Sequence, residues 1–114
     1  MRKTLTLACV LAASLSASAL AASTIKIVNK SGWDLHEIYF SPTSQDDWGE
    51  DHLGSQILEQ GDALTLYDVA AGRWDIRLVD EDGDECVLSN VHITESERWV
   101  VTEEDLLGCQ AATN

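Results

Sequence analysis

The fold is decided by residues 73–93, which read RWDIRLVDEDGDECVLSNVHI. In residues 73–80, apolar side chains alternate with charged ones, and this period of two is typical of a strand with one buried face. The dipeptide Asp82-Gly83 is a strong hairpin signal, because glycine adopts the positive φ that tight turns require. Residues 86–93 then return as the partner strand. The stretch therefore predicts a β-hairpin.

Further short strands are predicted on both sides of this hairpin, at residues 24–29, 33–41, 63–69 and 98–102. A change of apolar spacing near His36 and Glu37 indicates a β-bulge, and Pro42 ends its strand because proline donates no ladder hydrogen bond. The tail holds Leu106 and Leu107, for which one short helical turn is expected. The pattern predicts an all-β fold, either a small antiparallel β-sandwich (Ig-like or C2-like) or a partly closed barrel, with about six to eight short strands.

The N-terminus has the three parts of a signal peptide in the right order. Arg2 and Lys3 are positive, residues 4–20 carry no charge, and positions 19–21 read Ala-Leu-Ala, the small-x-small pattern of a cleavage site. The apolar run is short and weakly hydrophobic for a membrane span, which needs about 20 strongly apolar residues. We expect residues 1–21 to be a bacterial general secretory signal peptide; an uncleaved anchor helix is the alternative.

Cleavage would leave residues 22–114 as a single domain in the periplasm or the medium. Loss of Arg2 and Lys3 leaves five of the seven basic residues against all 20 acidic ones, a net charge of −15. Such a charge repels nucleic acid and anionic membranes, so neither is expected as a partner. It favours a basic protein, a cationic ligand or calcium, although acidity also simply keeps an exported protein in solution. We expect a monomer.

The cysteines predict one disulfide. Cleavage removes Cys9 and leaves Cys86 and Cys109 in an oxidising compartment, where an even pair is most simply bonded. No C-x-x-C motif or basic neighbour points to a reactive thiolate. A bond between the two would tie the C-terminal tail to a strand.

Several short motifs follow one another in a fixed order along residues 22–114. They are Asn29-x-Ser31-Gly32, Ile38-Tyr39-x-Ser41-Pro42, Asp47-Trp48-Gly49-x-Asp51-x-Leu53-Gly54, Trp74-Asp75-Ile76-Arg77, and Asp82-Gly83 leading to Cys86. In these motifs the chain resembles a family of small exported bacterial proteins. The resemblance spans nearly all of residues 22–114 and implies a secreted β-sandwich; it implies no activity.

The acidic turn at residues 80–85 is the first candidate site. Calcium takes six to eight oxygen ligands, and Asp80, Asp82 and Asp84 match the first three ligand positions of an EF-hand loop. The match ends there, because Glu85 replaces the required glycine and the flanking segments are strands. A calcium-binding turn of another kind and a solvated hairpin both remain open.

The second candidate is the run Asp46, Asp47, Trp48, Glu50 and Asp51. It lies in residues 42–56, the longest irregular stretch of the chain, and loops of this length tend to be functional. A tryptophan among carboxylates could receive a cationic group through charge and cation–π attraction. The alternative is that Trp48 folds inward and fixes the loop.

No catalytic constellation is found, so we expect no enzyme. The three histidines, His36, His52 and His92, show no ligand spacing for zinc, and Ser41 lacks the Gly-x-Ser-x-Gly elbow of a serine nucleophile. The sequence therefore favours an exported, acidic, non-catalytic binding or interaction module. A calcium-dependent structural or adhesive module is the alternative, and a hydrolase comes third. No cofactor is expected, with calcium as the exception to test.

Overall fold

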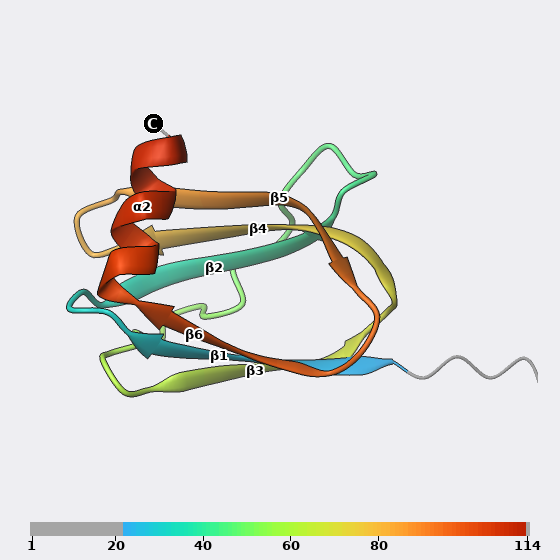
Figure 1. Cartoon of the computed structure of the whole chain (residues 1–114), viewed down its shortest axis with the longest axis horizontal. Coiled ribbons are helices and arrows are strands. Elements are labelled where there is room, and N and C mark those ends of the chain that lie inside the picture. Colours follow the sequence, from blue (N-terminus) through green and yellow to red (C-terminus); the bar gives the residue numbers. More distant parts are fainter. Residues whose placement is uncertain (1–21, 114) are drawn as a thin grey trace, which may run out of the picture.

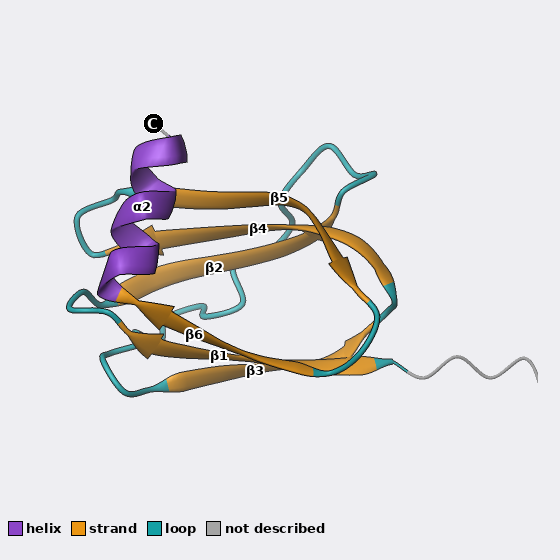
Figure 2. Ribbon diagram, in the orientation of Figure 1, coloured by secondary structure: helices purple, strands orange, loops and turns teal. Residues whose placement is uncertain are grey.

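The computed structural model describes residues 22–113, in which two three-stranded sheets pack face to face (Figures 1 and 2). One sheet has the order β3–β1–β6 and the other β2–β4–β5. The elements are β1 (Ser23–Lys30), β2 (Leu35–Pro42), β3 (Ala63–Val69), β4 (Gly72–Asp80), β5 (Glu85–Ile93), β6 (Glu97–Thr102) and α2 (Glu103–Thr113). This confirms the predicted all-β sandwich. The expected signal peptide and Cys9 lie outside the described residues.

The core lies between the two sheets and consists mainly of leucine and isoleucine side chains. The apolar residues that are no more than 1% exposed are Ile25, Ile27, Leu35, Ile38, Ile76, Ile93 and Leu106. Each such side chain contributes roughly 1.5–3 kcal/mol by leaving water. The alternation read from the sequence therefore places the apolar face of each strand against the opposite sheet.

Aromatic side chains connect the sheets beside these isoleucines. The ring of Phe40 on β2 lies 5.1 Å from that of Trp74 on β4 and 5.9 Å from that of Trp99 on β6. Both tryptophans are half-buried. Tilted rings at these separations are favourable beyond the area they bury.

The predicted hairpin forms between β4 and β5. The backbone N–H of Asp80 donates to the carbonyl of Asp84 (3.0 Å), and Gly83 adopts φ 83° in the turn. The predicted bulge is also present, as a shift of the β2–β4 register between Leu35 and Glu37.

The turn after β1 is built around Asn29, which is fully buried. Its side-chain Nδ2 donates to the carbonyls of Trp33 and Leu58, each at 2.8 Å. Its Oδ1 accepts from the backbone N–H (2.9 Å) and the hydroxyl (2.7 Å) of Ser31. One amide therefore holds the β1–β2 turn and the distant segment at Leu58 together, which explains the Asn-x-Ser pattern structurally.

The long loop between β2 and β3 is fixed against β2. His52 donates its backbone N–H to the Ile38 carbonyl (2.8 Å), and Leu35 and Leu58 exchange two backbone hydrogen bonds (3.0 and 2.9 Å). Leu53 and Leu58 are 4% and 5% exposed and join the core. The loop thus closes the side of the sandwich where β2 and β3 form the edges.

Two features differ from the sequence expectation. The pairing of β1 with β6 is parallel, whereas the other strand pairs are antiparallel. The tail forms α2, an eleven-residue helix and not a single turn. Thr102 accepts the backbone N–H of Asp105 (3.1 Å), a helix-capping contact, and three acidic residues in the first turn complement the helix dipole.

Within the described part of the chain, α2 included, no helix is long and apolar enough to cross a membrane.

Candidate functional site

The acidic loop divides into exposed and structural residues. Asp46, Asp47 and Glu50 are exposed. Asp51 is half-buried, and its Oδ1 accepts the backbone N–H groups of Ile38 (2.9 Å) and Leu53 (3.0 Å). This carboxylate therefore ties the loop to β2, and three charges of the run remain directed to solvent.

Trp48 packs against the sheet. Its ring lies 6.3 Å from that of Tyr39 on β2, and the side chain is half-buried. The hydroxyl of Tyr39 donates to Glu37, a bond that raises the pKa of the phenol above its ordinary value, with burial and neighbouring carboxylates adding to the effect. Both the tilted ring contact and the half-burial fit the inward arrangement of the tryptophan.

Tyr39 also carries the guanidinium of Arg77, 5.0 Å from the ring centroid. Arg77 forms an ion pair with Glu85 (2.9 Å), and this bond raises the pKa of the guanidinium. The cation–π position over the Tyr39 ring is therefore filled by a side chain of the protein.

A small hollow of about 140 Å³ lies between this loop and β4. Its lining includes Asp46, Asp47, Trp48 and Asp75. Asp75 accepts the Thr43 hydroxyl and a backbone N–H of β5 through one oxygen, both at 2.8 Å. The hollow is thus acidic, shallow and partly used by structural hydrogen bonds.

The acidic turn brings Asp80, Asp82 and Asp84 together, with one ligand atom of each within 4.8 Å of the others, so the group could hold a metal ion. Asp80 is 3% exposed and already bonded. Its Oδ1 accepts the backbone N–H groups of Asp82 (2.9 Å) and Asp84 (3.0 Å), and its Oδ2 accepts the Gln110 amide (2.7 Å). Asp80 therefore builds the hairpin turn and anchors α2.

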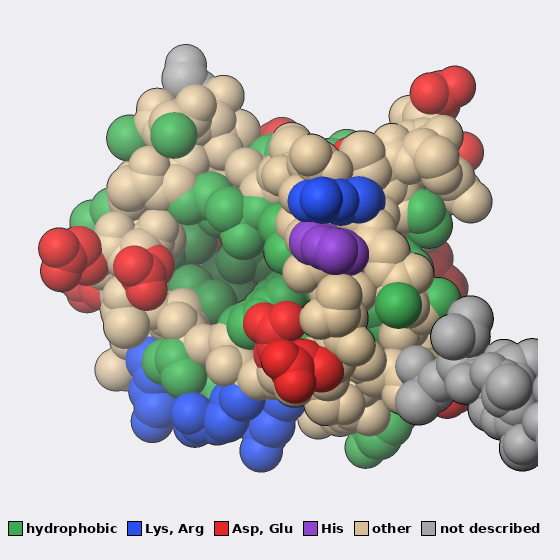
Figure 3. Space-filling view, turned by 45° about the vertical axis from the view of Figure 1, so that its right-hand side comes forward, with side chains coloured by type: hydrophobic (Ala, Val, Ile, Leu, Met, Phe, Trp, Pro, Cys, Tyr) green, Lys and Arg blue, Asp and Glu red, His purple; other side chains and the backbone are tan. Residues whose placement is uncertain are grey.

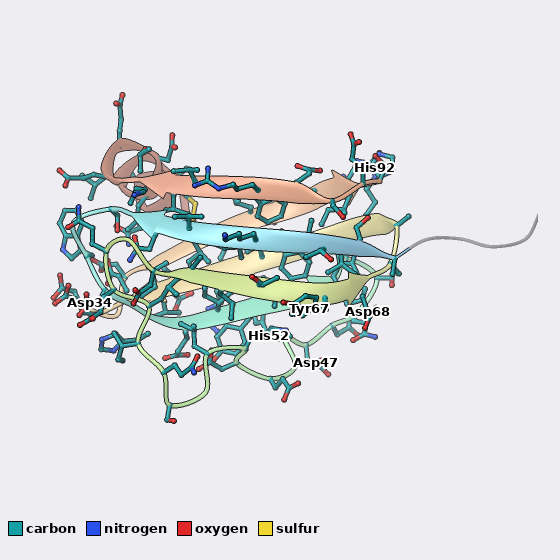
Figure 4. All side chains as sticks on the ribbon, turned by 90° about the horizontal axis from the view of Figure 1, so that it is seen from below. Asp34, Asp47, His52, Tyr67, Asp68 and His92 are labelled. Carbon is teal, nitrogen blue, oxygen red and sulfur yellow. A yellow bond between two sulfur atoms is a disulfide. The ribbon has the colours of Figure 1, made fainter. Side chains whose placement is uncertain are left out.

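The two acidic regions do not combine into one site. Glu81, in the turn, accepts the backbone N–H of Asp34 (2.9 Å), and Figure 4 shows Asp34 well separated from Asp47 along the domain. Across residues 22–113, the turn is the one group of three potential ligands that come together, and His36, His52 and His92 take no part in it.

The predicted disulfide between Cys86 and Cys109 is present, with a Cα–Cα distance of 5.1 Å. It fastens α2 to β5, and Thr113 accepts the Val87 backbone N–H (2.9 Å) at the far end of the helix. Leu106 from the same helix is 1% exposed and enters the core. The helix therefore covers only part of the second open side of the sandwich, where β5 and β6 form the edges.

The uncovered part of this side is an apolar cavity of about 350 Å³, which we call the β5–β6 cavity. Figure 3 shows it as a hollow lined by hydrophobic side chains. Apart from Asp105 its lining is apolar or aromatic: Ile27, Ile76, Leu78, Cys86, Leu88, Trp99, Val100, Val101, Leu106 and Cys109. A cavity of this size and character is typical of sites that accept an apolar group.

Acidic side chains lie at both ends of the β5–β6 cavity. Asp105 lines it at the α2 end beside Glu103 and Glu104, the other acids of the first helical turn. At the other end Glu97 accepts the indole N–H of Trp99 (2.9 Å). An apolar group carrying a positive charge therefore fits this cavity better than a neutral or negative one.

A second hollow of about 450 Å³ lies on the opposite side, between β3 and the long loop. Its lining includes Phe40, Trp74, His52, Tyr67 and Asp68, the last three of which Figure 4 shows on one side of the domain. Tyr67 is 72% exposed, so this is an open depression beside the loop, and its lining is more polar than that of the β5–β6 cavity.

The β5–β6 cavity could not be predicted from the sequence, because its residues come from five separate elements. Only the structure shows that Leu88, Val100 and Leu107, three large apolar residues, remain 43%, 38% and 45% exposed. Two of them, Leu88 and Val100, line the cavity.

No family model and no curated protein match the sequence. Among solved structures the chain is similar to a protein from Eubacterium rectale whose structure was determined by NMR, with a TM-score of 0.51 and 12% sequence identity. The similarity covers 71% of this chain and 77% of that one. At this identity it supports the fold alone.

Proposed function

We propose that this chain is an exported, non-catalytic binding module whose ligand is an apolar group that carries a positive charge, presented by a basic protein or a cationic small molecule. The observation that carries the proposal is the β5–β6 cavity, a solvent-open apolar space with carboxylates at both ends. The signal-peptide pattern, the disulfide and the resemblance to a family of exported proteins support a periplasmic or secreted location.

Hydrophobic burial and charge attraction would both favour such a ligand. Filling the cavity removes apolar surface of the protein and of the ligand from water, which is favourable by roughly 25 cal/mol per Å². The carboxylates and the net charge of −15 attract a cation and repel an anion. Affinity therefore comes mainly from the apolar body, and selectivity comes from the charge.

A matched pair of probes tests this directly. We expect phenylbutylammonium to bind and to shift the NMR signal of the Trp99 indole, while phenylbutyrate, which has the same apolar body, binds at least about tenfold more weakly. The preference should shrink as salt is raised, because the carboxylates at the cavity mouth are exposed to solvent.

Two variants locate the site. Leu88→Trp fills the mouth of the cavity from a position that is already 43% exposed, and it should weaken both probes. Asp105→Asn should reduce the cation preference by about threefold, whereas Glu104→Gln, which removes the same charge from the same helical turn away from the lining, should change it less. Equal binding of both probes, or binding that Leu88→Trp leaves intact, would reject the proposal.

Calcium binding at the acidic turn is the second candidate function, favoured by the three carboxylates within 4.8 Å. Because calcium needs six to eight oxygens, the turn would have to supply backbone carbonyls and water as well. A true site predicts a higher melting temperature in millimolar calcium than in EDTA, since a ligand well above its dissociation constant stabilises the fold. Asp82→Asn should remove that difference, and a difference below about 1 °C in the unaltered protein would rule the site out.

A further inference from the structure

The four sheet edges of the described domain are not protected equally. An exposed edge strand presents unpaired N–H and C=O groups, and proteins cover or distort such edges to prevent pairing with other chains. The edge of β2 is covered by the long loop, through the bonds between Ile38 and residues 51–52. The edge strand β3 is irregular, because its register with β1 shifts and Asp68 has φ 57°.

The edge of β5 is protected in two ways. The helix α2 lies against it, and the Val87 backbone N–H is bonded to Thr113. Farther along, the register with β4 shifts between Trp74 and Ile76, next to Asn90 with φ 58°. A β-bulge of this kind interrupts the regular row of hydrogen-bonding groups.

The edge of β6 has none of these devices. Its register with β1 runs without a shift from Glu97 to Thr102, and in residues 22–113 no backbone hydrogen bond reaches its outer edge from another segment. Every second residue of such a strand turns its N–H and C=O away from the sheet. The inward side chains of the strand, Trp99 and Val101, form one wall of the β5–β6 cavity.

We infer that the β5–β6 cavity takes an extended segment of a basic partner polypeptide, which adds to β6 as a fourth strand and inserts an apolar side chain between the sheets. This inference rests on the proposed function and specifies its ligand. Strand addition of this kind obtains affinity from main-chain hydrogen bonds and specificity from the side-chain pocket. Here the regular, unpaired edge of β6 offers the main-chain hydrogen bonds, and the β5–β6 cavity beside it offers the side-chain pocket.

The charges around β6 predict which side chains the added segment carries. Glu97 lies at the start of β6 and the acidic first turn of α2 at its end, so lysine or arginine is favoured at both ends of the added strand. On the outer face, Arg98 lies beside Lys26 in the register, and both are exposed. Outward side chains of the added strand should therefore be neutral or acidic, since like charges on neighbouring strands repel.

The same charges argue against a second copy of this chain as the occupant. An antiparallel β6–β6 pair centred on Val100 would bring Glu97 of each copy up to the acidic first turn of α2 of the other. Like charges directly opposite one another destabilise a strand pair, and each copy also carries a large net negative charge.

The experiment uses a synthetic peptide in which Leu and Val alternate with Thr, with lysines at both ends, added to the disulfide-bonded domain. Two derivatives are N-methylated at alternate residues, one in each register. Because only one set of peptide N–H groups can face β6, methylation of that set should weaken binding at least about tenfold, while methylation of the other set should leave it nearly unchanged. Binding is measured by calorimetry.

Variants of the protein give a second readout. Val100→Lys places a charge on the edge strand beside Arg98, at a residue that also lines the rim of the β5–β6 cavity, and should weaken peptide binding. Tyr67→Lys places the same charge on β3, the other edge of that sheet, and should not. Amide exchange of β6 should slow when the peptide is bound.

The remaining outcomes of these experiments would overturn strand addition, the cavity proposal or both. If both methylated peptides bind equally well, or if phenylbutylammonium binds but the peptide does not, strand addition is overturned while the cavity proposal stands. If neither the peptide nor phenylbutylammonium binds, both proposals fail. If sedimentation shows a concentration-dependent dimer that Val100→Lys abolishes, the occupant is a second copy and the inference of a basic partner is wrong.

Discussion

Replacing Asn29 with alanine is expected to lower the free energy of unfolding by about 3–5 kcal/mol, the largest effect we predict for a single substitution. The change removes four hydrogen bonds, each of which contributes about 0.5–1.5 kcal/mol. The carbonyls of Trp33 and Leu58 keep the Ser31 hydroxyl and the Leu35 N–H as donors, whereas the buried N–H of Ser31 loses its acceptor. Each buried group left unsatisfied costs about 1–3 kcal/mol. Domains of this size are stabilised by only about 5–15 kcal/mol in total, so the variant should be close to unfolding.

Urea denaturation of the variant and the unaltered protein measures this loss. Asn29→Asp is the sharper comparison, because it keeps the size and the acceptor but replaces the two donated bonds with a carboxylate oxygen facing two carbonyls. We expect it to be at least as destabilising as alanine. The adjacent exposed Lys30→Ala serves as control and should change stability by less than about 0.5 kcal/mol. A loss below about 1 kcal/mol for Asn29→Ala would show that the network does not hold the turn.

Removal of the disulfide should cost about 3 kcal/mol. Cys86 and Cys109 are 23 residues apart in sequence, and a loop of that length restricts the unfolded chain by roughly this amount in the chain-entropy model. The double variant Cys86→Ala, Cys109→Ala should therefore unfold at a lower urea concentration. Because both cysteines line the β5–β6 cavity, it should also bind phenylbutylammonium more weakly.

Reduction provides the matched control for this prediction. Dithiothreitol should destabilise the unaltered protein to about the level of the double variant and should leave the double variant itself unchanged. If the reduced protein unfolded at the same urea concentration as the oxidised one, α2 would have to be held by Leu106 and the bond from Gln110 to Asp80 without help from the covalent link.

The parts of the fold that depend on neighbouring residues in sequence could be predicted. The β4–β5 hairpin follows from alternation and from the Asp-Gly turn, because both act within a few residues. The disulfide follows from counting the cysteines that would remain after the predicted cleavage. The bulge near His36 could be read from a local change in apolar spacing, which the β2–β4 register confirms.

The remainder depends on contacts between distant segments. The helix α2 has little amphipathic character and is held by Leu106, by the disulfide and by Gln110, none of which shows as local periodicity. The β5–β6 cavity exists only once the strand order is known, because it needs β5 and β6 at edges on the same side. Sequence likewise cannot separate Asp51 and Asp80, which bond the backbone, from exposed acids such as Asp47.

The parallel pairing of β1 with β6 also constrains when the domain can fold. Ile25 is in register with Glu97, so the first strand completes its sheet only with the last. A chain that emerges from a ribosome or a translocation pore with its N-terminus first keeps one flank of β1 open until nearly the whole domain has appeared. Contacts of such long sequence separation also slow folding. The topology therefore delays completion of this sheet until nearly the whole domain is available.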